Sequence, residues 1–118
     1  MARLTIRVDL GPQAAIGPGK VRLLELIEAR GSLRAAAAAM GMSYRRAWLL
    51  LREIEAAMGA PAVAGRTGGS KGGGSALTPL GRAVIGEYRE IERQATRSAS
   101  LNLRALSRLC RPSRGTSG

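Results

Sequence analysis

The sequence predicts a mainly α-helical domain with a small β-sheet, an α+β fold. Three observations support this prediction. Apolar residues recur at spacings of three and four along several segments, serine, threonine or glycine stands at the ends of those segments, and short apolar runs suited to strands lie beside them. The chain has 118 residues, 45% of them apolar and none of them phenylalanine, so we expect one core built from aliphatic residues and alanine.

The first expected elements are a strand and a helix. Apolar and polar residues alternate from Leu4 to Leu10, which is typical of a half-buried strand. A loop rich in glycine and proline follows. We then expect a helix from Pro18 to Arg30, because proline suits a first helical turn and Gly31 suits a helix end.

Two further helices are expected to meet across a short turn. Ser32 can cap the run LRAAAAAM, and Ser43 can cap YRRAWLLLREIEAAM, which ends before Gly59. Only three residues, including Gly41, separate these segments. Two helices joined by so short a turn are typical of a helix-turn-helix motif. An ordinary helical hairpin with no role in DNA binding has the same pattern and remains an alternative.

The start of the second of these helices is the candidate nucleic-acid surface. At about 100° per residue, Ala47, Leu51, Ile54 and Met58 share one arc, which we expect to be buried. The remaining surface is rich in hydrogen-bond donors suited to base edges and phosphates. Trp48 fits the edge of the core equally well. The candidate DNA-binding residues of this motif are Arg34, Ser43, Tyr44, Arg45, Arg46, Trp48 and Arg52.

A glycine-rich loop follows the helix-turn-helix. We expect residues 63–66 and 75–77 to pair as a short hairpin around this loop. The loop does not match the nucleotide-binding P-loop, because Ser70 precedes Lys71 and Gly72 follows it. Glycines let the main chain approach a phosphate closely, and Arg66 and Lys71 supply charge, so both are candidate DNA contacts. A flexible linker is the alternative.

The last expected element is a long helix that begins with Thr78 as its cap and Pro79 in its first turn. Its apolar stripe exceeds what one small core can cover and continues through Leu103, Leu106 and Leu109. Such a stripe usually marks an interface. We therefore expect a homodimer through Leu80, Val84, Tyr88 and Ile91, a domain over residues 1–95, and a basic, partly disordered helix or tail over residues 96–118.

Charge and composition narrow the class of function. There are 19 Lys and Arg against 8 Asp and Glu, a net charge of +11, which predicts a polyanionic partner such as double-stranded DNA. Biased base composition and solubility are alternative reasons for the charge. With no histidine and one cysteine, Cys110, the usual zinc sites and catalytic triads lack their residues. We expect no enzyme, no metal and no cofactor.

The expected location is the cytoplasm, at the nucleoid. No apolar run approaches the roughly 18–20 residues of a membrane span, and the first residues lack the apolar region of a signal peptide. A single cysteine also fits a reducing compartment.

Two stretches resemble a known family. "GSLRAAAAAMGMSYRRAW" and "TGGSKGGGSALT" are similar to the helix-turn-helix and the wing of the ModE molybdate-responsive regulators, with a more distant likeness to LysR-type regulators. The resemblance runs from Pro18 to Arg93. It implies a winged helix-turn-helix fold with a C-terminal dimerisation helix, a recognition helix that begins at Ser43, and a DNA-binding transcriptional regulator whose wing tip is the glycine loop.

The resemblance also has a limit. Full-length ModE proteins carry oxyanion-binding domains, and residues 96–118 are too few to form one, so we expect no molybdate site in this chain. Two other classes of function stay open: a winged-helix module that binds proteins, and a protein that binds nucleic acids without sequence preference.

Overall fold

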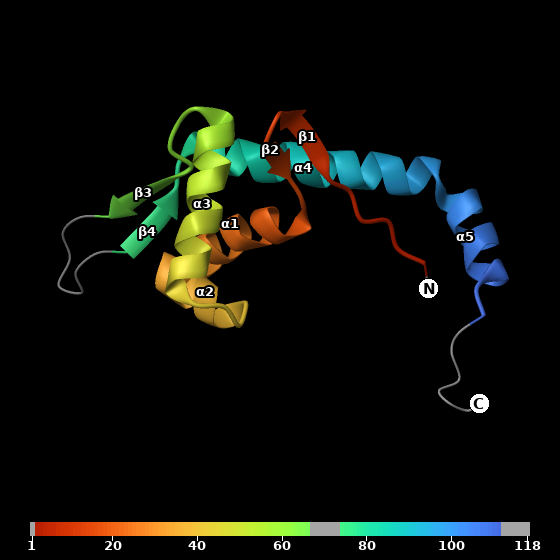
Figure 1. Ribbon diagram of the computed structural model, residues 1–118, viewed down its shortest axis with the longest axis horizontal. Coiled ribbons are helices and arrows are strands. Elements are labelled where there is room, and N and C mark those ends of the chain that lie inside the picture. Colours follow the sequence, from red (N-terminus) through yellow and green to blue (C-terminus); the bar gives the residue numbers. More distant parts are fainter. Residues whose placement is uncertain (1, 67–73, 112–118) are drawn as a thin grey trace.

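The computed structural model describes residues 2–66 and 74–111. Helices dominate, as predicted, and the strands form two separate antiparallel hairpins. In Figure 1 a head that contains both hairpins lies at one end, and a long helix leads away from it to the C-terminal helix. In chain order the elements are β1 (Val8–Gly11), β2 (Ala14–Ile16), α1 (Pro18–Arg30), α2 (Leu33–Ala39), α3 (Tyr44–Met58), β3 (Val63–Arg66), β4 (Gly74–Leu77), α4 (Pro79–Ser98) and α5 (Ser100–Leu109).

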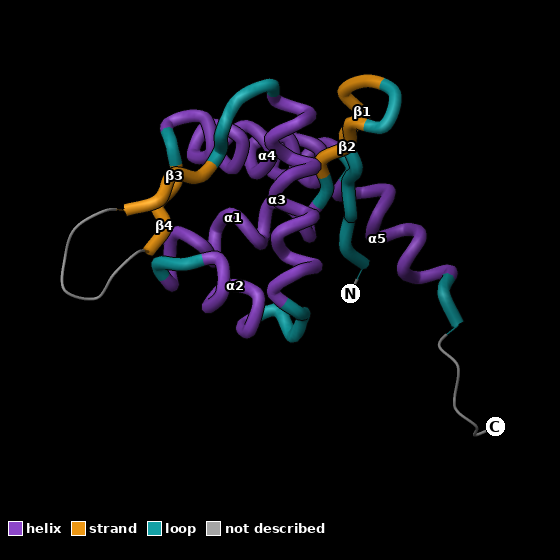
Figure 2. The backbone as a smooth tube through the Cα atoms, turned by 60° about the vertical axis from the view of Figure 1, so that its left-hand side comes forward, coloured by secondary structure: helices purple, strands orange, loops and turns teal. Residues whose placement is uncertain are grey.

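The core of the head is centred on α1. Leu23, Leu24 and Ile27 of this helix are fully buried. Helix α1 contacts α2, α3 and α4, and Figure 2 shows it between α2 and α4, with α3 beside it. The small side chains of Ala36 and Ala47 are also fully buried, which lets α2 and α3 pack closely against it. Apart from Tyr88, the core is therefore built from aliphatic residues and alanine, as expected.

The ends of the helices follow the sequence signals. The hydroxyl oxygens of Ser32, Ser43 and Thr78 each accept a hydrogen bond from the amide three residues further on, at 3.0–3.1 Å. Gly31 and Gly59 end α1 and α3 in the left-handed conformation, with φ of 87° and 75°. These local interactions confirm the predicted helix boundaries.

The N-terminal strand differs from its prediction. It begins only at Val8 and ends at Gly11, and its partner β2 comes from a stretch that the sequence suggested was loop. The chain reverses at residues 12 and 13, where Gln13 has a φ of 66°. Only residues opposite β2 find a partner, with Val8 facing Ile16, so residues 4–7 stay outside the hairpin.

The predicted last helix is divided in two. Its backbone leaves the helical conformation at Ala99, with φ −97° and ψ 7°, and Figure 1 shows α5 turning away from the axis of α4. Tyr88 also differs from expectation, because its side chain is only 3% exposed and belongs to the core of its own chain. The predicted disorder of the tail falls mostly on residues 112–118, outside the described residues.

Candidate nucleic-acid interface

The turn between α2 and α3 has a compact geometry. Met40, Gly41 and Met42 form it, and Gly41 has a φ of 70°, a conformation that favours glycine. The amide of Met42 donates to the carbonyl of Ala37 at 3.0 Å, which folds the turn back on α2. Ser43 is extended and starts α3. The turn thereby fixes the direction of α3 relative to α2.

Helix α3 has one buried and one exposed face. Ala47, Leu51 and Ile54 are buried against the core, as the spacing predicted, whereas Met58 of the same predicted arc is half-buried. Tyr44 and Trp48 are about two fifths exposed, at 43% and 42%. Since residues four apart share a helix face, these rings and Arg52 form one outward row. Arg45 and Arg46 are also exposed, in the first turn of α3.

Guanidinium groups cover both aromatic rings of this row. The guanidinium carbon of Arg34, on α2, lies 4.5 Å from the ring centre of Tyr44. That of Arg52 lies 5.5 Å from the ring of Trp48. Cation–π contacts of this kind hold the cation without using its N–H donors. The two arginines are thus positioned by aromatic rings, and the contacts with the rings occupy none of their N–H donors.

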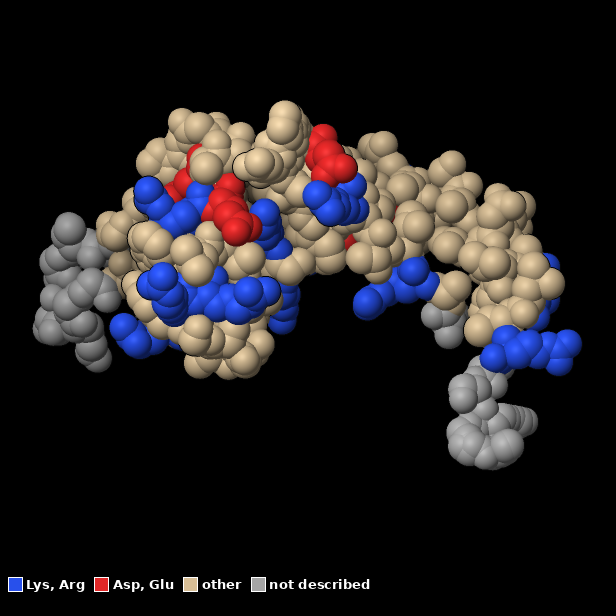
Figure 3. Space-filling view, viewed as in Figure 1, with Lys and Arg blue, Asp and Glu red and all other residues tan. Residues whose placement is uncertain are grey.

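The lower part of the head in Figure 3 shows basic side chains without acidic ones beside them. Figure 3 shows blue lysine and arginine side chains gathered over α2 and the start of α3, whereas the red acidic side chains lie further up the molecule. The sequence-predicted residues of the helix-turn-helix form an exposed region on α2, the turn and α3, namely Arg34, Ser43, Tyr44, Arg45, Arg46, Trp48 and Arg52. We call it the α3 surface.

The hairpin β3–β4 lies next to the end of α1. The predicted pairing is present, with Val63 opposite Leu77 and Arg66 opposite Gly74. The amide of Ser75 donates to the carbonyl of Gly31 at 2.7 Å, which attaches β4 to the helix end. Lys71 and the glycine-rich tip lie outside the described residues.

Glu55 is a functional candidate that the sequence reasoning missed. Its Oε2 accepts hydrogen bonds from the amides of Ala62 and Val63 at 2.9 and 3.4 Å, and Oε1 lies 3.7 Å from Arg52 Nη1. One carboxylate thus joins α3 to the base of the hairpin. Arg52, predicted as a DNA contact, also orients this carboxylate. The only signal in the sequence was an acidic residue one turn after Arg52 on a basic helix.

Neither a metal centre nor a membrane span is visible in the described part of the chain. Over residues 2–66 and 74–111, histidine, cysteine and acidic residues do not gather in groups of three or more that could hold a metal ion. No described helix is both long and apolar enough to cross a membrane.

A helix-turn-helix followed by a β-hairpin and a further helix defines the winged helix-turn-helix fold, in which β3–β4 is the wing. A solved structure shares this arrangement. The chain superposes on the CbnR_DBD–DNA complex with a TM-score of 0.55, covering 75% of this chain and 95% of that one at 22% identity. No protein-family model matches the chain.

Curated relatives are similar in sequence over the same region. The molybdenum transport protein ModE of Azotobacter vinelandii is 36% identical over 92 residues, which is 78% of this chain and 33% of the relative. The molybdenum-pterin-binding protein MopB of Rhodobacter capsulatus is 40% identical over 79 residues, 67% and 29% of the two chains. The DNA-binding transcriptional dual regulator ModE of Escherichia coli K12 is 31% identical over 87 residues, 74% and 33% of the two chains.

The chain spans about a third of the length of these relatives. The resemblance to ModE-type proteins that the two sequence motifs indicated is therefore confirmed for that third.

Proposed function

We propose that this chain is a sequence-specific DNA-binding transcriptional regulator that places α3 in the major groove and the wing on the adjacent backbone. The α3 surface carries the proposal, because an exposed, basic first turn of a recognition helix is the part that enters the groove in helix-turn-helix proteins. The printed name of the Escherichia coli relative, a DNA-binding transcriptional regulator, supports it.

The residues of the α3 surface have different proposed roles. Arg45 and Tyr44 contact base edges, because they stand exposed in the first turn of α3. Arg46 and Arg52 contact phosphates or bases. Ser43 caps α3, and its hydroxyl lies near a phosphate of the DNA backbone. Trp48 packs under Arg52. Arg34, together with Arg66 and Lys71 in the wing, holds the DNA backbone without reading sequence.

We further propose a homodimer through α4. A groove of about 260 Å³ runs between α4 and the hairpin β1–β2, and its walls include Leu80, Val84 and Ile91. The side chain of Tyr88 forms part of its floor. A two-fold dimer would read an inverted repeat with half-sites about one helical turn, or a multiple of it, apart. A single monomeric species in sedimentation at micromolar concentration, with and without DNA, would contradict this part of the proposal.

The remaining assignments follow from this role. Residues 1–95 form the DNA-binding unit and residues 96–118 a basic extension. The protein is not an enzyme, uses no cofactor and acts in the cytoplasm at the nucleoid.

The decisive experiment recovers bound fragments from a library of genomic DNA and compares variants on the selected duplex and on a random one. Arg45→Ala should weaken binding to the selected duplex by about tenfold or more and binding to the random duplex much less, because a bidentate base contact contributes about 1–3 kcal/mol of discrimination. Lys71→Ala should weaken both duplexes alike and lower the salt slope by about one. Arg108→Ala, an exposed arginine on α5 outside the proposed contacts, is the matched control.

Each alternative class predicts a different result. Equal affinity for random and selected duplexes would indicate non-specific nucleic-acid binding. Weak binding to every duplex would favour a protein-interaction module.

A further inference from the structure

A second basic feature lies away from the α3 surface. A cavity of about 690 Å³ opens between the N-terminal segment, the start of α1 and the second half of α4. Cavities that hold small molecules typically measure about 300–1,000 Å³. Its lining includes no residue of α2, α3 or the wing, and in Figure 1 the N-terminal segment lies on the side of the head away from the wing. Five of its lining residues are arginines: Arg3, Arg22, Arg89, Arg93 and Arg97.

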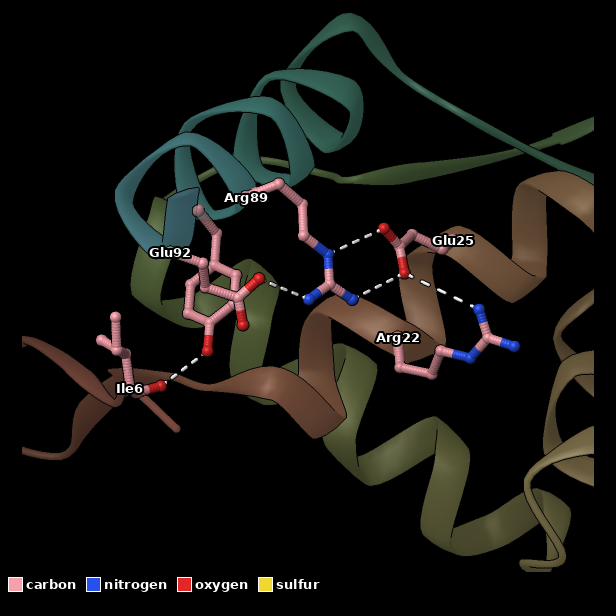
Figure 4. Close-up of polar contacts among 6 residues, drawn as sticks. Ile6, Arg22, Glu25, Arg89 and Glu92 are labelled. Atoms are coloured by element: carbon pink, nitrogen blue, oxygen red, sulfur yellow. Dashed lines mark hydrogen bonds and ion pairs between the residues drawn. The ribbon is translucent and has the colours of Figure 1, made fainter. Parts of the chain in front are cut away.

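The floor of this cavity is held rigidly by Arg89. Its Nε and Nη2 donate to the two carboxylate oxygens of Glu25, on α1, at 3.0 and 2.8 Å, and its Nη1 donates to Glu92 at 2.6 Å (Figure 4). These hydrogen bonds lower the pKa of Glu25 and raise that of Arg89, so both groups are charged at neutral pH. A bidentate pair of this kind fixes the geometry of both side chains.

The other four arginines of the lining form the rim of the cavity. They carry more positive charge than the neighbouring carboxylates neutralise. Arg22 Nη1 lies 3.9 Å from Glu25, a carboxylate already shared with Arg89. Arg93 pairs with Glu90 at 2.7 Å. Within residues 2–66 and 74–111, Arg3 and Arg97 form no ion pair.

Five guanidinium groups therefore face three carboxylates, those of Glu25, Glu90 and Glu92, which leaves two positive charges.

The N-terminal wall is also fixed in place. The hydroxyl of Tyr88 donates to the carbonyl of Ile6 at 2.6 Å, which ties the N-terminal segment to α4 (Figure 4). Burial raises the pKa of Tyr88, so the hydroxyl keeps its proton. Thr5, one residue before Ile6, and Thr96 of α4 both line the cavity. Leu4 and Pro18 add apolar surface to the same lining.

We propose that this cavity is a binding site for a small organic phosphate. The two excess positive charges match a phosphate monoester, which carries about −1.5 to −2 charges at pH 7. Guanidinium groups bind phosphate oxygens bidentately, and the hydroxyls of Thr5 and Thr96 supply further donors. The apolar surface of Leu4 and Pro18 suits the organic part of the ligand.

A small molecule fits this site better than duplex DNA. The cavity has walls from three separate elements, and its lining shares nothing with the α3 surface. A bound phosphate would contact the N-terminal segment, α1 and α4 together. It would therefore join the helix that packs beneath the helix-turn-helix to the helix that leads toward the C-terminus.

The test titrates the full chain, free of DNA, with phenyl phosphate in a calorimeter at fixed ionic strength. Inorganic phosphate and phenol probe the two halves of the ligand separately, and each should bind more weakly than phenyl phosphate. Arg3→Ala and Arg97→Ala should each weaken phenyl phosphate binding about tenfold, since each removes charge-assisted hydrogen bonds. Both side chains are exposed and unpaired within the described residues, so folding should be retained. Arg30→Ala removes the same charge elsewhere and should leave the affinity unchanged.

Three results would overturn the proposal. One is the absence of saturable binding at millimolar phenyl phosphate. A second is an equal loss in Arg30→Ala, which would indicate general attraction to a basic protein. The third is displacement of phenyl phosphate by duplex DNA together with weaker DNA binding by Arg97→Ala, which would assign the cavity to the DNA backbone.

Discussion

Replacing Gly81 by alanine tests how closely α4 approaches the base of the wing. Gly81 is buried in the first turn of α4. A Cβ atom built on it would lie well inside van der Waals contact with the carbonyl oxygen of Ala62. That oxygen is backbone, and it already accepts a hydrogen bond from the Thr78 amide at 2.9 Å. The added methyl group can be accommodated only if α4 moves away from Ala62.

One favourable and two unfavourable terms decide the sign of the change in stability. Alanine is favoured over glycine within a helix by about 1 kcal/mol. Overpacking typically costs about 1–3 kcal/mol. Stretching the hydrogen bond between Thr78 and Ala62 removes about 1 kcal/mol more. Because the clash is with backbone, we expect the upper part of the overpacking range and a net loss of about 2–3 kcal/mol in the free energy of unfolding.

Gly86 provides the matched control on the same helix. Nothing lies within 4 Å of a Cβ built there, so Gly86→Ala should stabilise the protein by about 0.5–1 kcal/mol through helix propensity alone. Urea unfolding followed by circular dichroism at equal protein concentration measures both changes. If Gly81→Ala is as stable as Gly86→Ala, the close packing of α4 on Ala62 does not exist in solution.

Three further predictions concern the N-terminal tie, the ion pair and the response to anions. Tyr88→Phe should lower the free energy of unfolding by about 1–2 kcal/mol, because the Ile6 carbonyl loses its donor, whereas Tyr44→Phe at the surface should change it little; equal effects would contradict the tie. Since Arg89 lowers the pKa of Glu25 below its ordinary value of 4.5, this pair stabilises the fold above that pH, and the contribution is lost as pH falls through the lowered pKa. Thermal unfolding between pH 7 and pH 3 should therefore show a smaller acid destabilisation in Arg89→Gln than in the unmodified chain, and an unchanged acid dependence would refute the assignment. Molybdate and sulfate at constant ionic strength should affect DNA affinity alike, because both are tetrahedral dianions and exposed arginines attract them with little geometric preference; a tenfold shift with molybdate alone would reveal a selective site.

The features that could be predicted from the sequence are those set by residues close together in the chain. The caps Ser32, Ser43 and Thr78 and the glycines that end α1 and α3 act within one helical turn, so their spacing alone is informative. The buried arc of α3 follows from helical periodicity for the same reason.

Contacts between distant segments were not predictable in this way. Glu25 and Arg89 are 64 residues apart, and Tyr88 and Ile6 are 82 apart. The residues next to Glu25, Arg89 and Tyr88 in the sequence give no sign that these side chains form long-range contacts. The side chain of Tyr88 is buried in the core because of how α4 packs against α1, which the local sequence does not reveal.

The carboxylate of Glu55 also limits how the protein can adapt to DNA. Because it accepts the amides of Ala62 and Val63, the base of the wing cannot swing relative to α3 without losing two hydrogen bonds. In the proposed complex, the distance between α3 in the major groove and the wing on the DNA backbone is then fixed by the protein. The duplex has to supply the matching groove width, and sequences that reach this width at low deformation energy are preferred even at base pairs that no side chain contacts.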